Sequence, residues 1–261
     1  MEAGDIAWVI MASALVLFMT PGLALFYGGM ERAKNVLNML MMNFFTISIV
    51  TVVWVAIGYS LVFGGDNWFI GNFEFLGLAG VGGEDQLNAM FQLTFAIITP
   101  ALISGAVAGR MKFSAWVMFT TLWALIIYPI VGHWTWGPSG WLGELGAIDF
   151  AGGLVVHINA GIAALALVLV LGPRRGFGKE AIRPHSLPLT LLGAGMLWFG
   201  WFGFNAGSGL AANAVDINAF LVTNTAAATA ALTWGLISQF QYGKMSAAGV
   251  ATAAVAGDRK S

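Results

Sequence analysis

His157 is the residue of this sequence with the clearest capacity for proton chemistry, because it lies within the apolar run 154–160. An ionisable side chain deep in such a run costs a few kcal/mol unless it faces a cavity or a partner. An imidazole takes up and releases protons near neutral pH, so one interpretation is a pore-lining or proton-relay residue. The alternative is a neutral histidine that hydrogen-bonds to a neighbouring helix.

Asp149 stands at the start of the same apolar segment and is followed by Phe-Ala-Gly-Gly. An aspartate at a helix start accepts hydrogen bonds from the free N–H groups of the first turn, and its charge suits the helix dipole. Its spacing of eight residues from His157 would bring both side chains close to one face of a regular helix. We therefore favour a capping role for Asp149 over direct contact with a cation.

Aromatic side chains recur at helical spacing in two further apolar segments. Trp201, Phe204 and Ser208 follow one another at intervals of three and four residues, so they share one helix face. Phe91 and Phe95 are four residues apart and also share a face. Such stripes more often serve packing than binding. A serine hydroxyl beside the rings gains nothing from lipid, which favours a polar cavity at the first stripe.

A group of tryptophans, Trp134, Trp136 and Trp141, lies at the end of another apolar segment. Tryptophans in such positions usually anchor a protein at the membrane interface. A tryptophan face at a pore mouth would instead attract a small cation, by about 0.5–2 kcal/mol. Composition leaves both interpretations open. His133 and His185 lie near the ends of apolar segments, and we expect both to be interfacial or loop histidines.

The chain as a whole is far more apolar than a soluble protein. Hydrophobic residues make up 59% of its 261 residues and charged residues 9%, whereas soluble domains carry about 25% charged residues. The lack of cysteine excludes disulfides, thiolate metal sites and cysteine nucleophiles. The net charge of −1 argues against a nucleic-acid partner, and the sequence gives no sign of a cofactor.

Apolar stretches of about 20 residues can cross the ~30 Å hydrocarbon layer as helices. The sequence predicts seven such spans, at about 6–29, 38–63, 89–109, 114–135, 150–172, 187–207 and 218–241. An eighth apolar segment begins near Ser246 and reaches only Gly257, which is too short to span. We therefore predict an all-α polytopic membrane protein.

The charged residues sort between alternate connections of these spans. One set of connections holds the basic residues Arg32, Lys34, Arg110, Lys112, Arg174, Arg175, Lys179, Arg183 and Lys244. The intervening set holds Asp66, Glu74, Glu84, Asp85, Glu144, Asp149 and Asp216, with no Lys or Arg. By the positive-inside rule the basic connections are cytoplasmic and the N-terminus is outside. The acidic N-terminal flank argues against a cleaved signal peptide at this point.

Several stretches together resemble the Amt/MEP ammonium transporter family. Residues 149–161, Asp-Phe-Ala-Gly-Gly-Leu-Val-Val-His-Ile-Asn-Ala-Gly, resemble the family signature on its fifth helix. The stretches 20–29, 91–95, 176–180 and 201–208 are similar to other family motifs in content and order. The resemblance covers a membrane domain at 1–257, and the tail 258–261 does not match. A tryptophan at position 136 fits this branch better than the related Rhesus branch.

The resemblance implies an ammonium transporter fold of eleven helices, in two pseudo-symmetric halves, assembled as a homotrimer with one pore per subunit. The chain would hold about seven of these helices and the start of an eighth, so it looks C-terminally truncated. The resemblance also implies a multi-pass location in the plasma membrane. It further implies regulation by a PII-type signalling protein on the cytoplasmic face.

The resemblance also implies the site. Ammonium would bind in a vestibule formed by Trp136, Ser208 and Phe95. Phe91 and Gln92 would line the pore entrance, and the ring pair Phe95 and Phe204 would occlude the pore. Trp201 and His157 would line the pore, with His157 as the first of two neighbouring pore histidines. Asp149 would be the structural aspartate of the family.

The implied function is transport of ammonium or ammonia through a hydrophobic pore, with cation recruitment, deprotonation and conduction past a histidine. The alternative is a truncated, inactive member that associates with full-length subunits. An enzyme is a more distant alternative, in which Ser208 and His157 would imitate an intramembrane serine hydrolase. The expected Gly-x-Ser-Gly motif is missing, because Ala206 occupies its first position.

Overall fold

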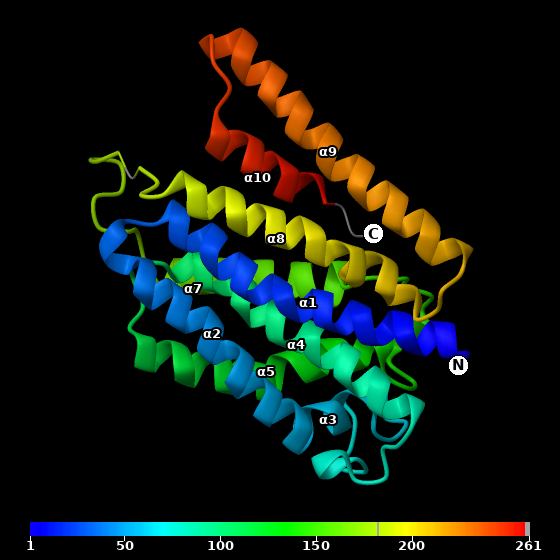
Figure 1. The fold of residues 1–261 in the computed structure, drawn as a ribbon. Helices are drawn as coiled ribbons and strands as arrows, with labels where there is room; N and C mark the ends of the chain where they lie inside the picture. The colour runs from blue at the N-terminus through cyan, green and yellow to red at the C-terminus, as the bar shows by residue number, and fades with distance from the viewer. Residues whose placement is uncertain (182, 259–261) are drawn as a thin grey trace. The chain divides into compact units, whose positions relative to one another are not determined.

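The computed structural model describes residues 1–181 and 183–258, and over these residues the chain is helical with no β-strand (Figure 1). Seven helical segments in this part of the chain are long and apolar enough to cross a membrane. They are Ala3–Met30, Ala33–Phe63, Glu84–Val107, Phe113–Glu144, Gly153–Leu171, Leu187–Gly209 and Ala214–Tyr242. The seven predicted spans are confirmed, and helix α10, Ala247–Gly257, is the short eighth segment.

The chain divides into two compact units. Unit 1 consists of Met1–Asn43 and residues 173–258, and unit 2 consists of Phe44–Gly172. The boundary falls inside helix α2, Val36–Val53. Unit 1 therefore joins the two ends of the described chain, whereas unit 2 is one continuous stretch.

Unit 1 is built around the pairing of α1, Ala3–Met30, with α8, Leu187–Asn205, which lie side by side (Figure 1). Glycines allow the two backbones to approach closely. A Cβ on Gly193 would lie 2.5 Å from the carbonyl oxygen of Gly22, and a Cβ on Gly22 would lie 2.7 Å from Cβ of Met196. Such small-residue contacts replace the hydrophobic effect as the force that joins helices in lipid.

The remaining helices of unit 1 are the short 3₁₀ turn η1, Ala33–Asn35, the 3₁₀ turn η5, Ala206–Gly209, and the pair α9, Ala214–Tyr242, and α10. Asn213 caps α9 by accepting hydrogen bonds from the N–H groups of Val215 and Asp216. A groove of about 1130 Å³ between α9 and α10 is lined mainly by apolar and threonine side chains.

Unit 2 contains the rest of α2, the π-helical turn η2, Trp54–Gly58, and α3, Tyr59–Phe63. After the 3₁₀ turn η3, Leu76–Leu78, come α4, Glu84–Val107, α5, Phe113–Trp136, and the single turn α6, Trp141–Glu144. The unit ends with the π-helical turn η4, Gly153–Ile158, and α7, Asn159–Leu171. Helix α4 is the most deeply packed span, and it contacts α5, η4 and α7.

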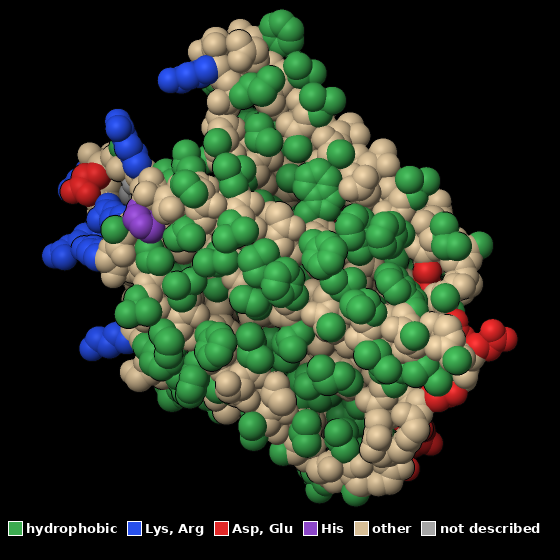
Figure 2. Space-filling model, in the orientation of Figure 1, with side chains coloured by type: hydrophobic (Ala, Val, Ile, Leu, Met, Phe, Trp, Pro, Cys, Tyr) green, Lys and Arg blue, Asp and Glu red, His purple; other side chains and the backbone are tan. Residues whose placement is uncertain are grey.

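Charges separate along the helices within each unit, and hydrophobic side chains cover the surface between them (Figure 2). In unit 1, Arg32 follows α1 and Arg183 precedes α8, while Asp5 and Asp216 lie in the first turns of α1 and α9. In unit 2, basic residues occupy the connection 108–112 between α4 and α5, and acidic residues lie at the opposite helix ends. In each unit the basic residues named here therefore gather at one end of the helices, which is the pattern that the positive-inside rule describes.

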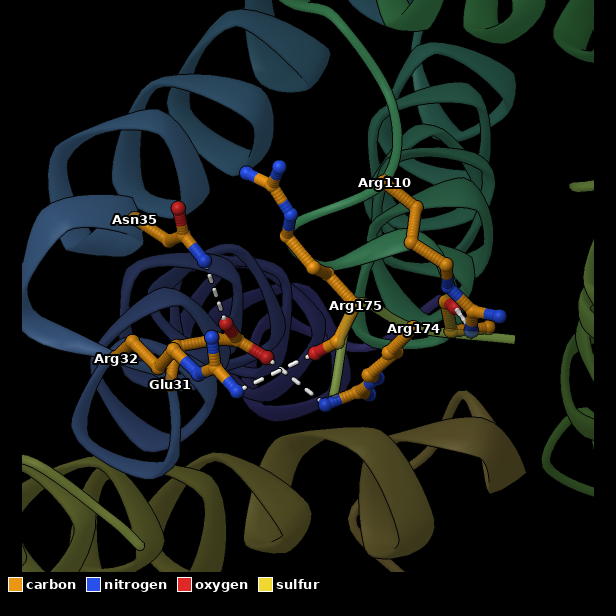
Figure 3. A network of polar contacts seen from close by, with 7 residues as sticks. Glu31, Arg32, Asn35, Arg110, Arg174 and Arg175 are labelled. Carbon is orange, nitrogen blue, oxygen red and sulfur yellow. Dashed lines mark hydrogen bonds and ion pairs between the residues drawn. The ribbon is translucent and has the colours of Figure 1, made fainter. Parts of the chain in front are cut away.

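A polar network joins the connection before α8 to the end of α1 in unit 1 (Figure 3). Arg174 pairs with Glu31 at 3.0 Å, and Asn35 donates to the same carboxylate at 3.0 Å. Glu31 is only 6% exposed, so its charge needs these partners. A second ion pair, between Arg32 and Glu180 at 3.2 Å, is more exposed to solvent.

Candidate functional site

Helix α4 presents two phenylalanine rings from its first half. The ring centroids of Phe91 and Phe95 are 4.9 Å apart, and both side chains are 2% exposed. Gln92 lies between them in the sequence and is half-buried. A spacing of four residues places the two rings on one face of the helix, as the sequence indicated.

Trp136 is the last residue of α5 and is half-buried. Its ring meets that of Phe95 edge to face, with centroids 6.1 Å apart and planes at 84°. The indole Nε1–H donates a hydrogen bond of 2.9 Å to the main-chain oxygen of Asp149. The indole is therefore fixed both by an aromatic contact and by a hydrogen bond.

The carboxylate of Asp149 serves the start of the next span. It accepts hydrogen bonds from the N–H groups of Gly153, Leu154 and Val155, at 2.6, 2.9 and 2.9 Å. These are the capping hydrogen bonds that the sequence favours, and they satisfy N–H groups that a helix start otherwise leaves free. The span begins at Gly153, three residues later than the predicted position 150, because residues 150–152 are not helical.

Gly152 makes the turn between the capping residue and the span. Its φ of 86° lies in the left-handed region, which glycine adopts at little cost. A Cβ at this position would lie 2.6 Å from Cγ2 of Val156 and 3.6 Å from Cδ1 of Phe95. The Phe95 ring therefore packs against this turn as well as against Trp136.

His157 lies in a π-helical turn, Gly153–Ile158, and is half-buried. The expectation that Asp149 and His157 share a face of one regular helix was wrong. Asp149 precedes the helix, and a π turn holds more residues than an α turn, so the eight-residue register does not apply. Single π turns inside α-helices occur often at functional sites.

Unit 1 carries the second group of predicted site residues, near the end of α8. Trp201 and Phe204 are 3% and 1% exposed. Ser208 follows in η5, and its hydroxyl donates a 2.7 Å hydrogen bond to the main-chain oxygen of Phe204. The predicted site residues thus form one group in each unit: Phe91, Gln92, Phe95, Trp136, Asp149 and His157 in unit 2, and Trp201, Phe204 and Ser208 in unit 1.

His133 was expected to be an interfacial or loop histidine. It lies in the last turn of α5 and not in a loop, and it is 0% exposed, a degree of burial that the sequence did not indicate. Both ring nitrogens contact main-chain oxygens, those of Val62 and Asn67. Its position one turn before Trp136 is the only signal in the sequence that could have drawn attention to it. His185 is exposed in the connection before α8, as expected.

Comparison with known proteins identifies relatives along nearly the whole chain. The sequence model described as "Ammonium Transporter Family" matches residues 7–258. The chain is 48% identical to ammonium transporter Amt1 of Archaeoglobus fulgidus, over 98% of this chain and 66% of that protein. It is 49% identical to an ammonium transporter of Aquifex aeolicus, over 98% of this chain and 62% of that protein.

A solved structure shares the fold. The crystal structure of Candida albicans Mep2 matches with a TM-score of 0.92 at 37% identity, over 98% of this chain and 59% of that chain. The chain therefore spans about three-fifths to two-thirds of the length of these relatives.

Proposed function

Because this chain belongs to the ammonium transporter family, we propose that it forms part of a hydrophobic pathway that moves ammonium or ammonia across a membrane. One observation carries the proposal: Trp136 meets Phe95 edge to face while its indole is held by Asp149. The carboxylate of the same aspartate caps the turn that contains His157. A cation-attracting ring, an apolar ring and an imidazole are thus arranged around one capped turn.

The first step of the proposed mechanism is recruitment of the cation. A bare ammonium ion pays a large solvation penalty in an apolar pore, so water must first be replaced by other contacts. The face of Trp136 supplies a cation–π contact worth about 0.5–2 kcal/mol. Phe95 adds a second ring, and the hydroxyl of Ser208 is proposed as the oxygen ligand.

The second step is deprotonation and passage. The free-energy cost of crossing an apolar constriction is far lower for neutral ammonia than for a cation. We assign the constriction to the rings of Phe95 and Phe204. Phe91 and Gln92 would lie at the entrance, and Trp201 would line the wall. The imidazole of His157 then relays the proton. Potassium has no proton to release, so the same pathway rejects it.

We extend the proposal to the assembly and its orientation. The chain acts as a subunit of a homotrimer in the plasma membrane, with its N-terminus outside and a PII-type regulatory protein on the cytoplasmic face. The orientation is supported by the basic residues at one end of each unit, which the positive-inside rule assigns to the cytoplasm. A protease-accessibility assay on sealed vesicles tests it at the connection 173–186.

Uptake of radiolabelled methylammonium into proteoliposomes tests the transport function. The purified chain should give saturable uptake, and His157→Ala should abolish it or change the charge moved per substrate. His185→Ala is the matched control, because His185 is an exposed residue of a connection. Absence of uptake by the unmodified chain would contradict transport by this polypeptide. The charge moved is measured as the methylammonium current, and an unchanged current in His157→Ala would contradict the proton relay.

The alternative, an inactive subunit that associates with full-length relatives, has one supporting observation. Only five of the 29 residues of α9 are buried, and the groove beside α10 is lined mainly by apolar and threonine side chains. Such a surface suits contact with further transmembrane helices. Co-purification of the tagged chain with a full-length family member, together with reduced uptake by that member, would support this alternative.

A further inference from the structure

The C-terminal end of α5 contains a buried histidine that the proposed pathway does not use. His133 is 0% exposed, and its Nδ1 lies 2.6 Å from the main-chain oxygen of Val62 in α3. Its Nε2 contacts the main-chain oxygen of Asn67, in the connection after α3. Trp136 is three residues further along the same helix, on the neighbouring turn.

In both contacts the ring nitrogen must be the hydrogen-bond donor. A main-chain carbonyl oxygen only accepts hydrogen bonds, so each ring nitrogen must carry a proton to make its contact. A neutral imidazole has one N–H group and supplies one of the two hydrogen bonds. Only the ring with both nitrogens protonated donates to Val62 and Asn67 together.

The surrounding backbone is shaped to admit this ring. A Cβ on Gly137 would lie 2.5 Å from the oxygen of Val62 and would also collide with Nδ1 of His133. The connection that carries Asn67 is itself held back on α3, through hydrogen bonds from Gly71 N to Leu61 O at 2.8 Å and from Asn72 N to Gly64 O at 3.0 Å. The imidazole therefore joins a fixed connection to the end of α5.

We propose that His133 is a positioning residue for Trp136. By donating hydrogen bonds to Val62 and Asn67, it fixes the last turn of α5 and so holds the Trp136 ring against Phe95. The proposal rests on the substrate-recruiting role assigned to Trp136 above.

Hydrogen–deuterium exchange tests the structural half of the proposal without reference to transport. His133→Phe keeps a ring and removes both donors, and Gly137→Ala should force the ring and Val62 apart. Both variants should speed exchange in peptides covering 62–72 and 133–141, and leave α1 and α8 unchanged. His185→Phe is the control. Unchanged exchange in both variants would overturn the proposal.

Nitrogen-15 NMR of histidine-labelled protein tests the protonation requirement directly. The chain has three histidines, so single substitutions of His157 and His185 assign the ring signals. The two-donor arrangement requires both ring nitrogens of His133 to carry protons. A signal pair with one bare nitrogen at His133 would overturn the two-donor arrangement.

Transport kinetics test the functional half. His133→Phe should raise the KM for methylammonium by roughly twofold or more, up to the effect of Trp136→Leu, with little change in kcat. Added to Trp136→Leu, it should raise the KM no further.

The readouts separate the two hypotheses. Faster exchange in His133→Phe with an unchanged KM would overturn positioning of Trp136, while the hydrogen bonds themselves stand. If the unmodified chain shows no uptake, the proposed function fails, and binding of methylammonium measured by calorimetry takes the place of KM. Additive effects of His133→Phe and Trp136→Leu on that binding would then overturn the proposal.

Discussion

The ring of Trp136 meets the ring of Phe95 edge to face, at a centroid distance of 6.1 Å and an interplanar angle of 84°. This geometry is the favoured one for two aromatic rings, because the positive edge of one faces the negative face of the other. The contact connects the end of α5 to the buried face of α4. It also leaves the half-buried indole partly open to a ligand.

Replacement of Trp136 by leucine should weaken substrate recruitment. The lost cation–π contact is worth about 0.5–2 kcal/mol, which corresponds to a rise in the KM for methylammonium of roughly 2- to 30-fold. Trp68→Leu is the control, because Trp68 is 63% exposed in the connection after α3. Equal KM values for the two variants would remove Trp136 from the binding site.

Replacement of Asp149 by alanine should destabilise unit 2. Three N–H groups at the start of η4 would lose their acceptor, and loss of a helix cap typically costs about 0.5–2 kcal/mol. We expect a loss at the upper end of that range, measured as the free energy of unfolding in detergent. Asp149→Asn should lose less, since its amide oxygen still accepts. Asp66→Asn, at an exposed position, should have no effect.

A single methyl group should separate α1 from α8. Gly193→Ala would place a Cβ 2.5 Å from the oxygen of Gly22, so the helices must move apart and lose packing. We expect a lower thermal unfolding temperature and less folded protein in the membrane. Gly195→Ala is a matched control on the same helix, because no atom lies within 4 Å of its added Cβ. A stable Gly193→Ala variant would show that this contact can relax.

The ion pair between Arg174 and Glu31 (Figure 3) and the ion pair between Arg32 and Glu180 should differ in strength. Arg174→Ala leaves the buried Glu31 carboxylate with only Asn35, and should cost about 2 kcal/mol of folding free energy, less than a fully buried pair because Arg174 is 34% exposed. Arg32→Ala breaks the exposed pair with Glu180 and should cost at most about 1 kcal/mol. Equal losses, measured by unfolding in detergent, would contradict this ranking.

The helical spans were predictable because length and hydropathy decide them. The seven predicted spans are all present, and Ser246 begins the short eighth helix by accepting a hydrogen bond from the N–H of Gly249. The capping role of Asp149 was also predictable from the sequence, because an aspartate at the start of an apolar helix accepts hydrogen bonds from the free N–H groups of the first turn. These features were predictable because each depends on residues that are close together in the sequence.

Which side of each span is buried in the protein was much harder to predict. In water an apolar stripe marks the buried face of a helix, but lipid is as apolar as a protein core. Val156 is 0% exposed while Ile158, two residues on, is 60% exposed, and nothing in their types separates them. The same ambiguity hid the burial of His133. The π turn at His157 was missed because its residues fit an α-helix equally well.

The pairing of α1 with α8 has a consequence for the order of events during synthesis. Residues 31–186 separate the two helices, so at ~5–20 residues per second the ribosome needs roughly 8–30 s to supply the partner of α1. All of unit 2 is made in that interval, and its helices can pack before α8 exists. The α1–α8 pair can therefore form after the helices of unit 2 have packed, although α1 is made before them.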